Sequence, residues 1–148
     1  MTKQTPQFWF QWILDSLQEG KEVEITANGW SMCPSIKPGS VLTLIKVPIE
    51  ALKVGDAIAF TRGEHFVVHR VEKIIPQEPF QIWSRGDANL SFDEIVSSQN
   101  YCGKVNGFVL KPAPSLLQRI FYFLLQLIQI NWARAKKIPS LLKRDSAI

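Results

Sequence analysis

The sequence predicts a mainly β domain over residues 22–112, flanked by an N-terminal amphipathic helix (1–21) and a C-terminal apolar helix with a basic tail (113–148). Two observations predict this fold class. The central part alternates β-branched runs with turn signals, whereas the two ends carry apolar residues at helical spacing. A third observation sets the size: 148 residues that are 46% hydrophobic are enough to bury one core.

The N-terminal segment predicts a short amphipathic helix that ends near Gly20. Its apolar residues are interrupted by Gln11, Asp15 and Gln18, and Lys3 is its only leading cation, which is not the pattern of a secretory signal. A membrane span would need roughly 20 consecutive apolar residues, which do not fit before the first strand. We therefore expect neither a cleavable signal nor a membrane span in this segment, and whether the helix attaches to a membrane or to a partner stays open.

Short strands separated by turns are predicted from about residue 22 to residue 110. The pairs Pro38-Gly39 and Gly55-Asp56 are turn signals that precede apolar runs. The β-branched and aromatic content of these runs favours strands. The runs that we expect to be strands are 41–45, 57–60, 66–75 and 80–84.

Residues 115–132 predict a helix with an unusually wide apolar face. On a helical wheel the polar side chains gather in one narrow sector: Ser115, Gln118, Arg119, Tyr122, Gln126 and Gln129. Every other position from Leu116 to Ile130 is Leu, Ile or Phe, so most of the circumference must be covered. Two interpretations stay open: burial against the β domain or a dimer partner, or contact of residues 115–137 with a membrane surface. A complete span is disfavoured, because only fourteen residues separate Arg119 from Arg134.

The net charge of +4 is confined to the C-terminal segment. Residues 1–132 hold twelve basic and twelve acidic side chains, whereas residues 133–148 hold five basic side chains against Asp145. A neutral body with a basic tail suits an anionic membrane surface. No helix-turn-helix or zinc-ligand spacing is present, so we expect no nucleic-acid partner.

The two cysteines, Cys33 and Cys102, have no metal-ligand spacing. Two thiols without a disulfide framework favour a reduced, cytoplasm-facing body, either cytoplasmic or peripherally attached to a membrane. A disulfide between Cys33 and Cys102 stays open at this point.

Candidate catalytic residues are Ser31, His69 and two carboxylates, Asp87 and Asp93. A serine hydroxyl is a poor nucleophile unless a base takes its proton, so a serine, a histidine and an acid form an economical set for peptide-bond hydrolysis. His69 shares a strand face with two valines and is the better base. The other histidine, His65, follows a predicted hairpin turn and is expected to be solvated.

Each of these residues also has a purely structural interpretation. Ser31 would be a loop serine, and His69 a core histidine bonded to a carbonyl group. Asp87 would satisfy the backbone of its own turn. Asp93 would lie in a helical first turn, since residues 91–94 match a capping box.

Five motifs in order favour the catalytic interpretation. They are Gly-x-Ser-Met-x-Pro at 29–34, Val-Gly-Asp-Ala-Ile-Ala-Phe at 54–60, His-Arg-Val at 69–71, Arg-Gly-Asp-Ala-Asn at 85–89 with Asp93 beyond it, and Gly-Lys-Val at 103–105. Together they resemble type I signal peptidases, in the histidine variant of the endoplasmic-reticulum and archaeal enzymes. The resemblance covers about residues 27–110 and implies the β fold that these peptidases share with self-cleaving repressors.

The resemblance implies a serine endopeptidase that cleaves peptide precursors at small-residue sites. In this interpretation Ser31 is the nucleophile, His69 the general base and Asp93 the acid that orients it, with Asp87 in support. A backbone N–H of the turn that begins at Gly29 would help to bind the oxyanion.

The resemblance also implies an extended peptide or protein substrate in a shallow apolar groove, for which Met32 and Trp30 are the candidate lining residues. It implies no cofactor and no metal. Two alternatives stay open: a self-cleaving repressor-like protein with a lysine base, and an inactive β scaffold. Neither Lys46 nor Lys104 occupies the position of such a lysine.

Overall fold

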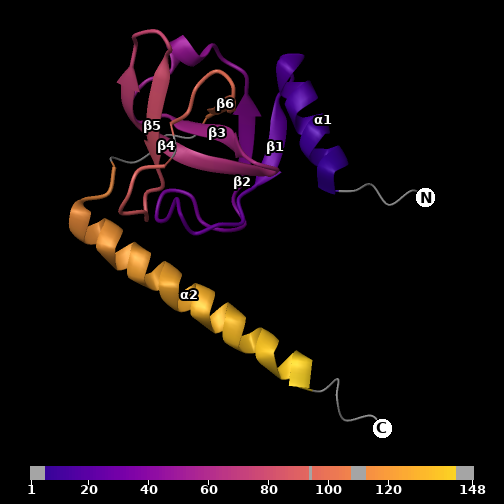
Figure 1. Ribbon diagram of the computed structural model, residues 1–148, viewed down its shortest axis with the longest axis vertical. Coiled ribbons are helices and arrows are strands. Elements are labelled where there is room, and N and C mark those ends of the chain that lie inside the picture. The colour runs from indigo at the N-terminus through magenta and orange to yellow at the C-terminus, as the bar shows by residue number, and fades with distance from the viewer. Residues whose placement is uncertain (1–5, 94, 108–112, 143–148) are drawn as a thin grey trace.

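The computed structural model describes residues 6–93, 95–107 and 113–142, and within these ranges the side chains of residues 7–131. Two helices and six strands follow one another along the chain (Figure 1): α1 (Pro6–Gln18), β1 (Val23–Thr26), β2 (Val41–Ile45), β3 (Ala57–Arg62), β4 (His65–Ile75), β5 (Gln81–Arg85), β6 (Tyr101–Val105) and α2 (Leu116–Leu142). A 3₁₀ turn at Ile49–Ala51 links β2 to β3. The predicted mainly β class with a helix at each end is confirmed.

All strands belong to one antiparallel sheet in the order β1-β2-β6-β3-β4-β5. The four predicted strands are present within one or two residues, and β1 and β6 are additional. The predicted boundary after residue 21 falls between α1 and β1, whereas the boundary at residue 112 lies outside the described residues.

The sheet separates two apolar clusters, and β3 contributes to both. Ala57 and Ala59 face the cluster that contains Leu44 of β2, and Ile58 and Phe60 face the other. Successive side chains of a strand point to opposite faces, so a strand buried on both sides is apolar at every position, as β3 is over residues 57–60.

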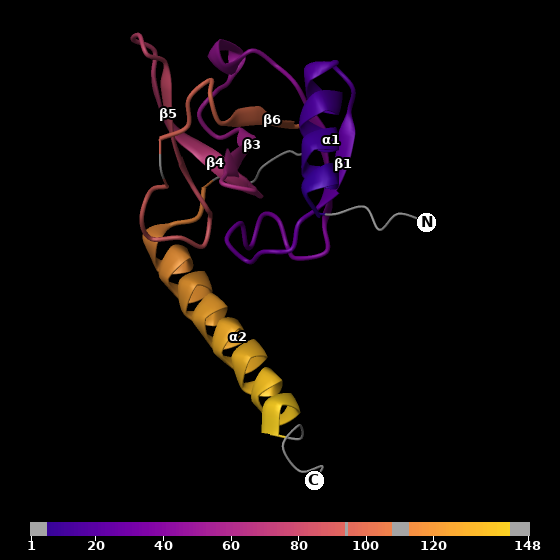
Figure 2. The same ribbon diagram turned by 45° about the vertical axis from the view of Figure 1, so that its right-hand side comes forward.

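Helix α1 packs on the first of these clusters through Leu17, which is 1% exposed, with Ile13 and Leu14 at its edge. Figures 1 and 2 show the helix lying beside β1. The opposite side of α1 exposes the aromatic side chains of Phe8, Trp9 and Trp12.

Strands β3 and β4 form a hairpin with a two-residue turn at Gly63-Glu64, where Gly63 has a φ of 60°. The register of this hairpin pairs His69 with Ile58, in the middle of the sheet. His65 opens β4 and is exposed, as predicted from the turn.

Helix α2 is longer than the predicted 115–132 segment and continues to Leu142. Figures 1 and 2 show that its C-terminal half lies clear of the sheet. No helix within the described residues is both long enough and apolar enough to cross a membrane. Of the basic tail, residues 143–148 lie outside the described residues.

Candidate active site

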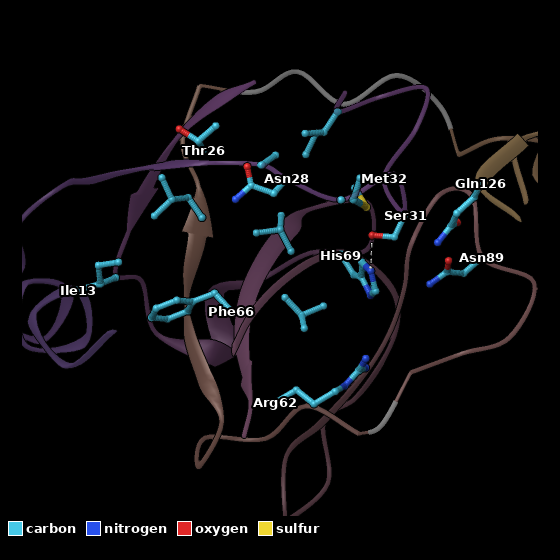
Figure 3. Close-up of a pocket in the computed structure, with 16 residues that line it drawn as sticks. Ile13, Thr26, Asn28, Ser31, Met32, Arg62, Phe66, His69, Asn89 and Gln126 are labelled. Carbon is cyan, nitrogen blue, oxygen red and sulfur yellow. Dashed lines mark hydrogen bonds between the residues drawn. The ribbon is translucent and has the colours of Figure 1, made fainter. Parts of the chain in front are cut away.

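Ser31 and His69 are hydrogen-bonded to each other, although they lie 38 positions apart in the chain. Ser31 lies in the serine loop, residues 29–36, which follows β1. His69 lies in the middle of β4 and is 3% exposed. The distance from His69 Nε2 to Ser31 Oγ is 2.9 Å (Figure 3).

The other ring nitrogen of His69 faces Asp93. Nδ1 lies 2.5 Å from Asp93 Oδ2, and both side chains are less than a tenth exposed. An ionised carboxylate accepts hydrogen bonds and cannot donate them, so Nδ1 carries the hydrogen. Nε2 is then left with a lone pair that accepts the Ser31 hydroxyl proton.

The Asp93 carboxylate is hydrogen-bonded to side chains of three strands, β3, β4 and β5. Its Oδ2 accepts a further hydrogen bond from Ser84 Oγ at 3.2 Å, and its Oδ1 accepts one from Arg62 at 3.2 Å. Burial by itself raises the pKa of Asp93, but the hydrogen bond and charge of His69 and the bonds from Arg62 and Ser84 outweigh it. The pKa of Asp93 therefore lies below its ordinary value, and the carboxylate is charged at neutral pH.

The capping-box alternative for Asp93 does not fit the structure, because residues 91–93 and 95–97 are not helical. The Asp93 N–H instead donates to the Ser84 carbonyl oxygen at 2.9 Å, which fixes the segment beside the end of β5.

Asp87 is hydrogen-bonded not to His69 but to the neighbouring residue of β4, Arg70. The guanidinium donates to both Asp87 oxygens at 2.7 Å, and the Asp87 side chain is fully buried. Ser35 of the serine loop donates to Asp87 and accepts from Arg70 at 3.2 Å. This pair therefore ties the serine loop to β4 and to the acid turn, residues 86–89.

The acid turn also holds the backbone of the serine loop. The Ala88 N–H donates to the Ser31 carbonyl oxygen at 2.7 Å. At Gly86 an added Cβ would lie 2.6 Å from that oxygen and 3.0 Å from His69 Nε2, so only glycine fits between the two candidate residues. At Gly29 the nearest atom to an added Cβ is Ser31 Oγ at 3.9 Å, an ordinary contact.

Helix α2 supports the acid turn from outside through Arg119, which is 4% exposed. Its guanidinium donates to the carbonyl oxygens of Gly86 and Asp87 at 3.2 and 3.5 Å and pairs with Glu72 at 2.6 Å. Two members of the polar sector, Arg119 and Gln126, therefore face the site.

A pocket of about 590 Å³ opens beside Ser31 and His69. Its walls come from α1, the end of β1 with the segment that follows it, β4 and α2, as Figure 3 shows. Met32 is among its lining residues and is at the same time buried in the apolar cluster that contains Leu44. Trp30, the other predicted lining residue, is not among them and is 39% exposed.

Gln126 of α2 also lines this pocket, and Figure 3 shows it on the same side as Ser31 and Asn89. Its Oε1 is buried and has no hydrogen-bond partner among the described residues. A buried acceptor without a partner is costly, so Gln126 is an acceptor available to a bound molecule.

Both lysines considered as alternative bases are engaged elsewhere. Lys46 donates to the Tyr101 carbonyl oxygen at 3.2 Å, and Lys104 pairs with Asp56 at 2.8 Å.

Cys33 and Cys102 are buried free thiols, not a disulfide. Burial raises the pKa of Cys33, and it raises that of Cys102 to about 11.

Sequence reasoning missed several residues of this site. Arg70 and Gly86 stood in the quoted motifs, and their roles were not assigned there. Ser35, Ser84 and Arg62 belong to no motif.

Within the described residues no cluster of His, Cys, Asp and Glu is arranged to hold a metal ion.

The geometry is a hydrogen-bond chain of hydroxyl, imidazole and carboxylate beside a pocket. Comparison with known proteins adds no relative: no family model, no curated protein and no solved structure matches the chain.

Replacement of Asp87 by alanine is expected to destabilise the fold by about 3–5 kcal/mol, because Arg70 would stay buried without a counter-charge. Urea unfolding monitored by circular dichroism measures this. Glu19→Ala is the control, since Glu19 pairs with Lys21 at the surface and should cost less than about 1 kcal/mol. Equal, small losses in both variants would contradict the role given to the buried pair.

The lowered pKa of Asp93 predicts a pH-dependent contribution to stability. The charged carboxylate stabilises the fold fully above its ordinary pKa of 3.8, and this contribution is lost as the pH falls through the lower folded value. Asp93→Asn should therefore be less stable than the wild type at pH 7, and the difference should shrink in acid. Urea titrations across this range test it, and a difference independent of pH would refute it.

Proposed function

We propose that the protein is a serine endopeptidase with Ser31 as nucleophile, His69 as general base and Asp93 as the orienting acid. The observation that carries this proposal is the unbroken hydrogen-bond chain from Ser31 Oγ through His69 to Asp93. This imidazole joins a half-buried hydroxyl to a buried carboxylate, and both lie beside a pocket that a substrate can enter.

The reaction would begin when a peptide carbonyl carbon comes within reach of Ser31 Oγ. His69 Nε2 takes the hydroxyl proton as the Oγ–C bond forms, and Asp93 stabilises the imidazolium. The imidazolium then gives the proton to the leaving amine as the peptide C–N bond breaks. A water molecule then takes the place of the amine. His69 Nε2 takes a proton from the water as its oxygen bonds to the acyl carbon, and Ser31 Oγ leaves and regains that proton.

The oxyanion of this reaction needs donors on the serine loop. Within the described residues, the N–H groups of Ser31 and Met32 donate to no other group of the chain. Backbone N–H groups at a nucleophile are the usual donors to a tetrahedral oxyanion. This supports the prediction that the turn beginning at Gly29 supplies the oxyanion site.

An extended peptide is the substrate form that the pocket favours. β1 is an edge strand, and residues 25–29 at its end line the pocket. An edge strand offers unpaired backbone groups with which a peptide can form a further strand. The buried Oε1 of Gln126 would accept a backbone N–H of that peptide.

The signal-peptidase-like fold and the preference for small residues near the scissile bond remain proposals that rest on the resemblance over residues 27–110. The antiparallel sheet is compatible with that fold. The self-cleaving alternative needs a lysine base, and Lys46 and Lys104 are bound elsewhere. The inactive-scaffold alternative gives no reason for the hydrogen-bond chain at the pocket.

Ser31→Ala and His69→Ala are each expected to lower peptide cleavage by at least about a thousandfold without unfolding the chain. A peptide library with small residues at successive positions, read by mass spectrometry, measures cleavage, and circular dichroism checks the fold. His65→Ala is the matched control, because His65 is exposed and should leave cleavage near the wild-type rate. Absence of cleavage by the wild type, or undiminished cleavage by either site variant, would refute the proposal.

Gly86→Ala is expected to slow cleavage by more than about tenfold, because the added Cβ must push Ser31 and His69 apart. Gly29→Ala should slow it far less, since its Cβ meets only an ordinary contact and its N–H is kept. The two variants carry the same chemical change on either side of Ser31. Equal rates in both would contradict the packing argument.

A further inference from the structure

Helix α2 turns Arg119 and Gln126 toward the β domain and most of its large apolar side chains outward. The side chains that face the domain include Arg119, which is buried, and Gln126, which lines the pocket. The apolar face of α2 consists of exposed large side chains: Leu116, Leu117, Ile120, Phe121, Leu124, Leu125, Leu127, Ile128 and Ile130. A helix on the surface of a soluble domain normally has the opposite orientation, so this face requires a cover.

The orientation is fixed by strong interactions. Arg119 is the one charged residue in 116–131, and its pairing with Glu72 and the acid turn holds it against the domain. Turning the apolar face inward would expose that guanidinium and break these bonds. The domain therefore cannot cover the apolar face without losing the support of the acid turn.

We propose that the apolar face of α2 lies in the interface of an anionic membrane. The exposed apolar positions extend over more than half of the helix circumference, and a lipid surface can cover a face of that width. A second copy of the helix would bury one stripe and leave the rest in water.

The basic side chains that follow this apolar face favour a membrane with anionic lipid headgroups. Arg134, Lys136 and Lys137 lie in the C-terminal half of α2, and Lys143 and Arg144 follow it, against Asp145 alone. Cations that adjoin an inserted apolar face bind anionic headgroups and fall within reach of the surface potential. Figures 1 and 2 show this half of the helix projecting past the β domain, where a flat surface can reach it.

Vesicle co-sedimentation of the full chain carrying Ser31→Ala tests this proposal. We expect binding to vesicles of phosphatidylglycerol and phosphatidylcholine, and weaker binding to phosphatidylcholine alone or at high salt. Leu124→Glu/Ile128→Glu should weaken binding to the mixed vesicles by more than about tenfold. Gln118→Glu/Gln129→Glu is the matched control with the same change in charge, and it should weaken binding less than about threefold.

Failure to bind the anionic vesicles, or an equal effect of the two double variants, would overturn the proposal. Analytical ultracentrifugation without lipid provides a second arm. A dimer that Leu124→Glu/Ile128→Glu dissociates would make a second copy the occupant of this face and would equally overturn it. Because the binding assay uses the Ser31→Ala chain, its outcome is independent of whether the protein cleaves peptides.

Discussion

The serine loop is held against the sheet by a buried ion pair, Arg70 and Asp87, and the rest of the site depends on that attachment. The loop contains no helix or strand, and its own backbone hydrogen bonds are turn bonds from Cys33 N–H to the Trp30 carbonyl and from Ile36 N–H to the Met32 carbonyl, so the position of Ser31 relative to the sheet depends on contacts outside the loop. Ser35 joins the pair at one end of the loop, and the Ala88 N–H fixes the Ser31 carbonyl at the other. A hydroxyl can stay 2.9 Å from an imidazole on a different element only when both ends are held in this way.

The two aspartates near the site have different roles because their surroundings differ. Asp87 faces a guanidinium with which it makes two parallel hydrogen bonds, an arrangement that favours rigidity. Asp93 faces an imidazole, a hydroxyl and a more exposed guanidinium, so its charge is available to a ring that gains and loses a proton. They lie six residues apart, and the end of β5 directs them to neighbouring residues of β4.

Much of the fold could be predicted from the sequence, because β2 to β5 are apolar runs bounded by glycine and proline turns. β6 was harder to predict, since Gly103 and Lys104 are weak strand formers. Gly103 is nevertheless suited to its place, because an added Cβ would lie 2.7 Å from the Ile45 carbonyl oxygen. The grouping of Ser31, His69 and Asp93 followed from motif order. Ser84, Arg62 and Gln126 could not be found in that way, because their positions depend on how distant elements pack.

The two thiols of this chain have a practical consequence for chemical probes. Both are buried, and their raised pKa values keep them protonated at neutral pH, so they react slowly with maleimides and iodoacetamides. A cysteine introduced at an exposed position of α2 would be alkylated in preference to both. Spin labels or fluorophores can therefore be attached along that helix in the otherwise native chain, without first replacing its own sulfur atoms.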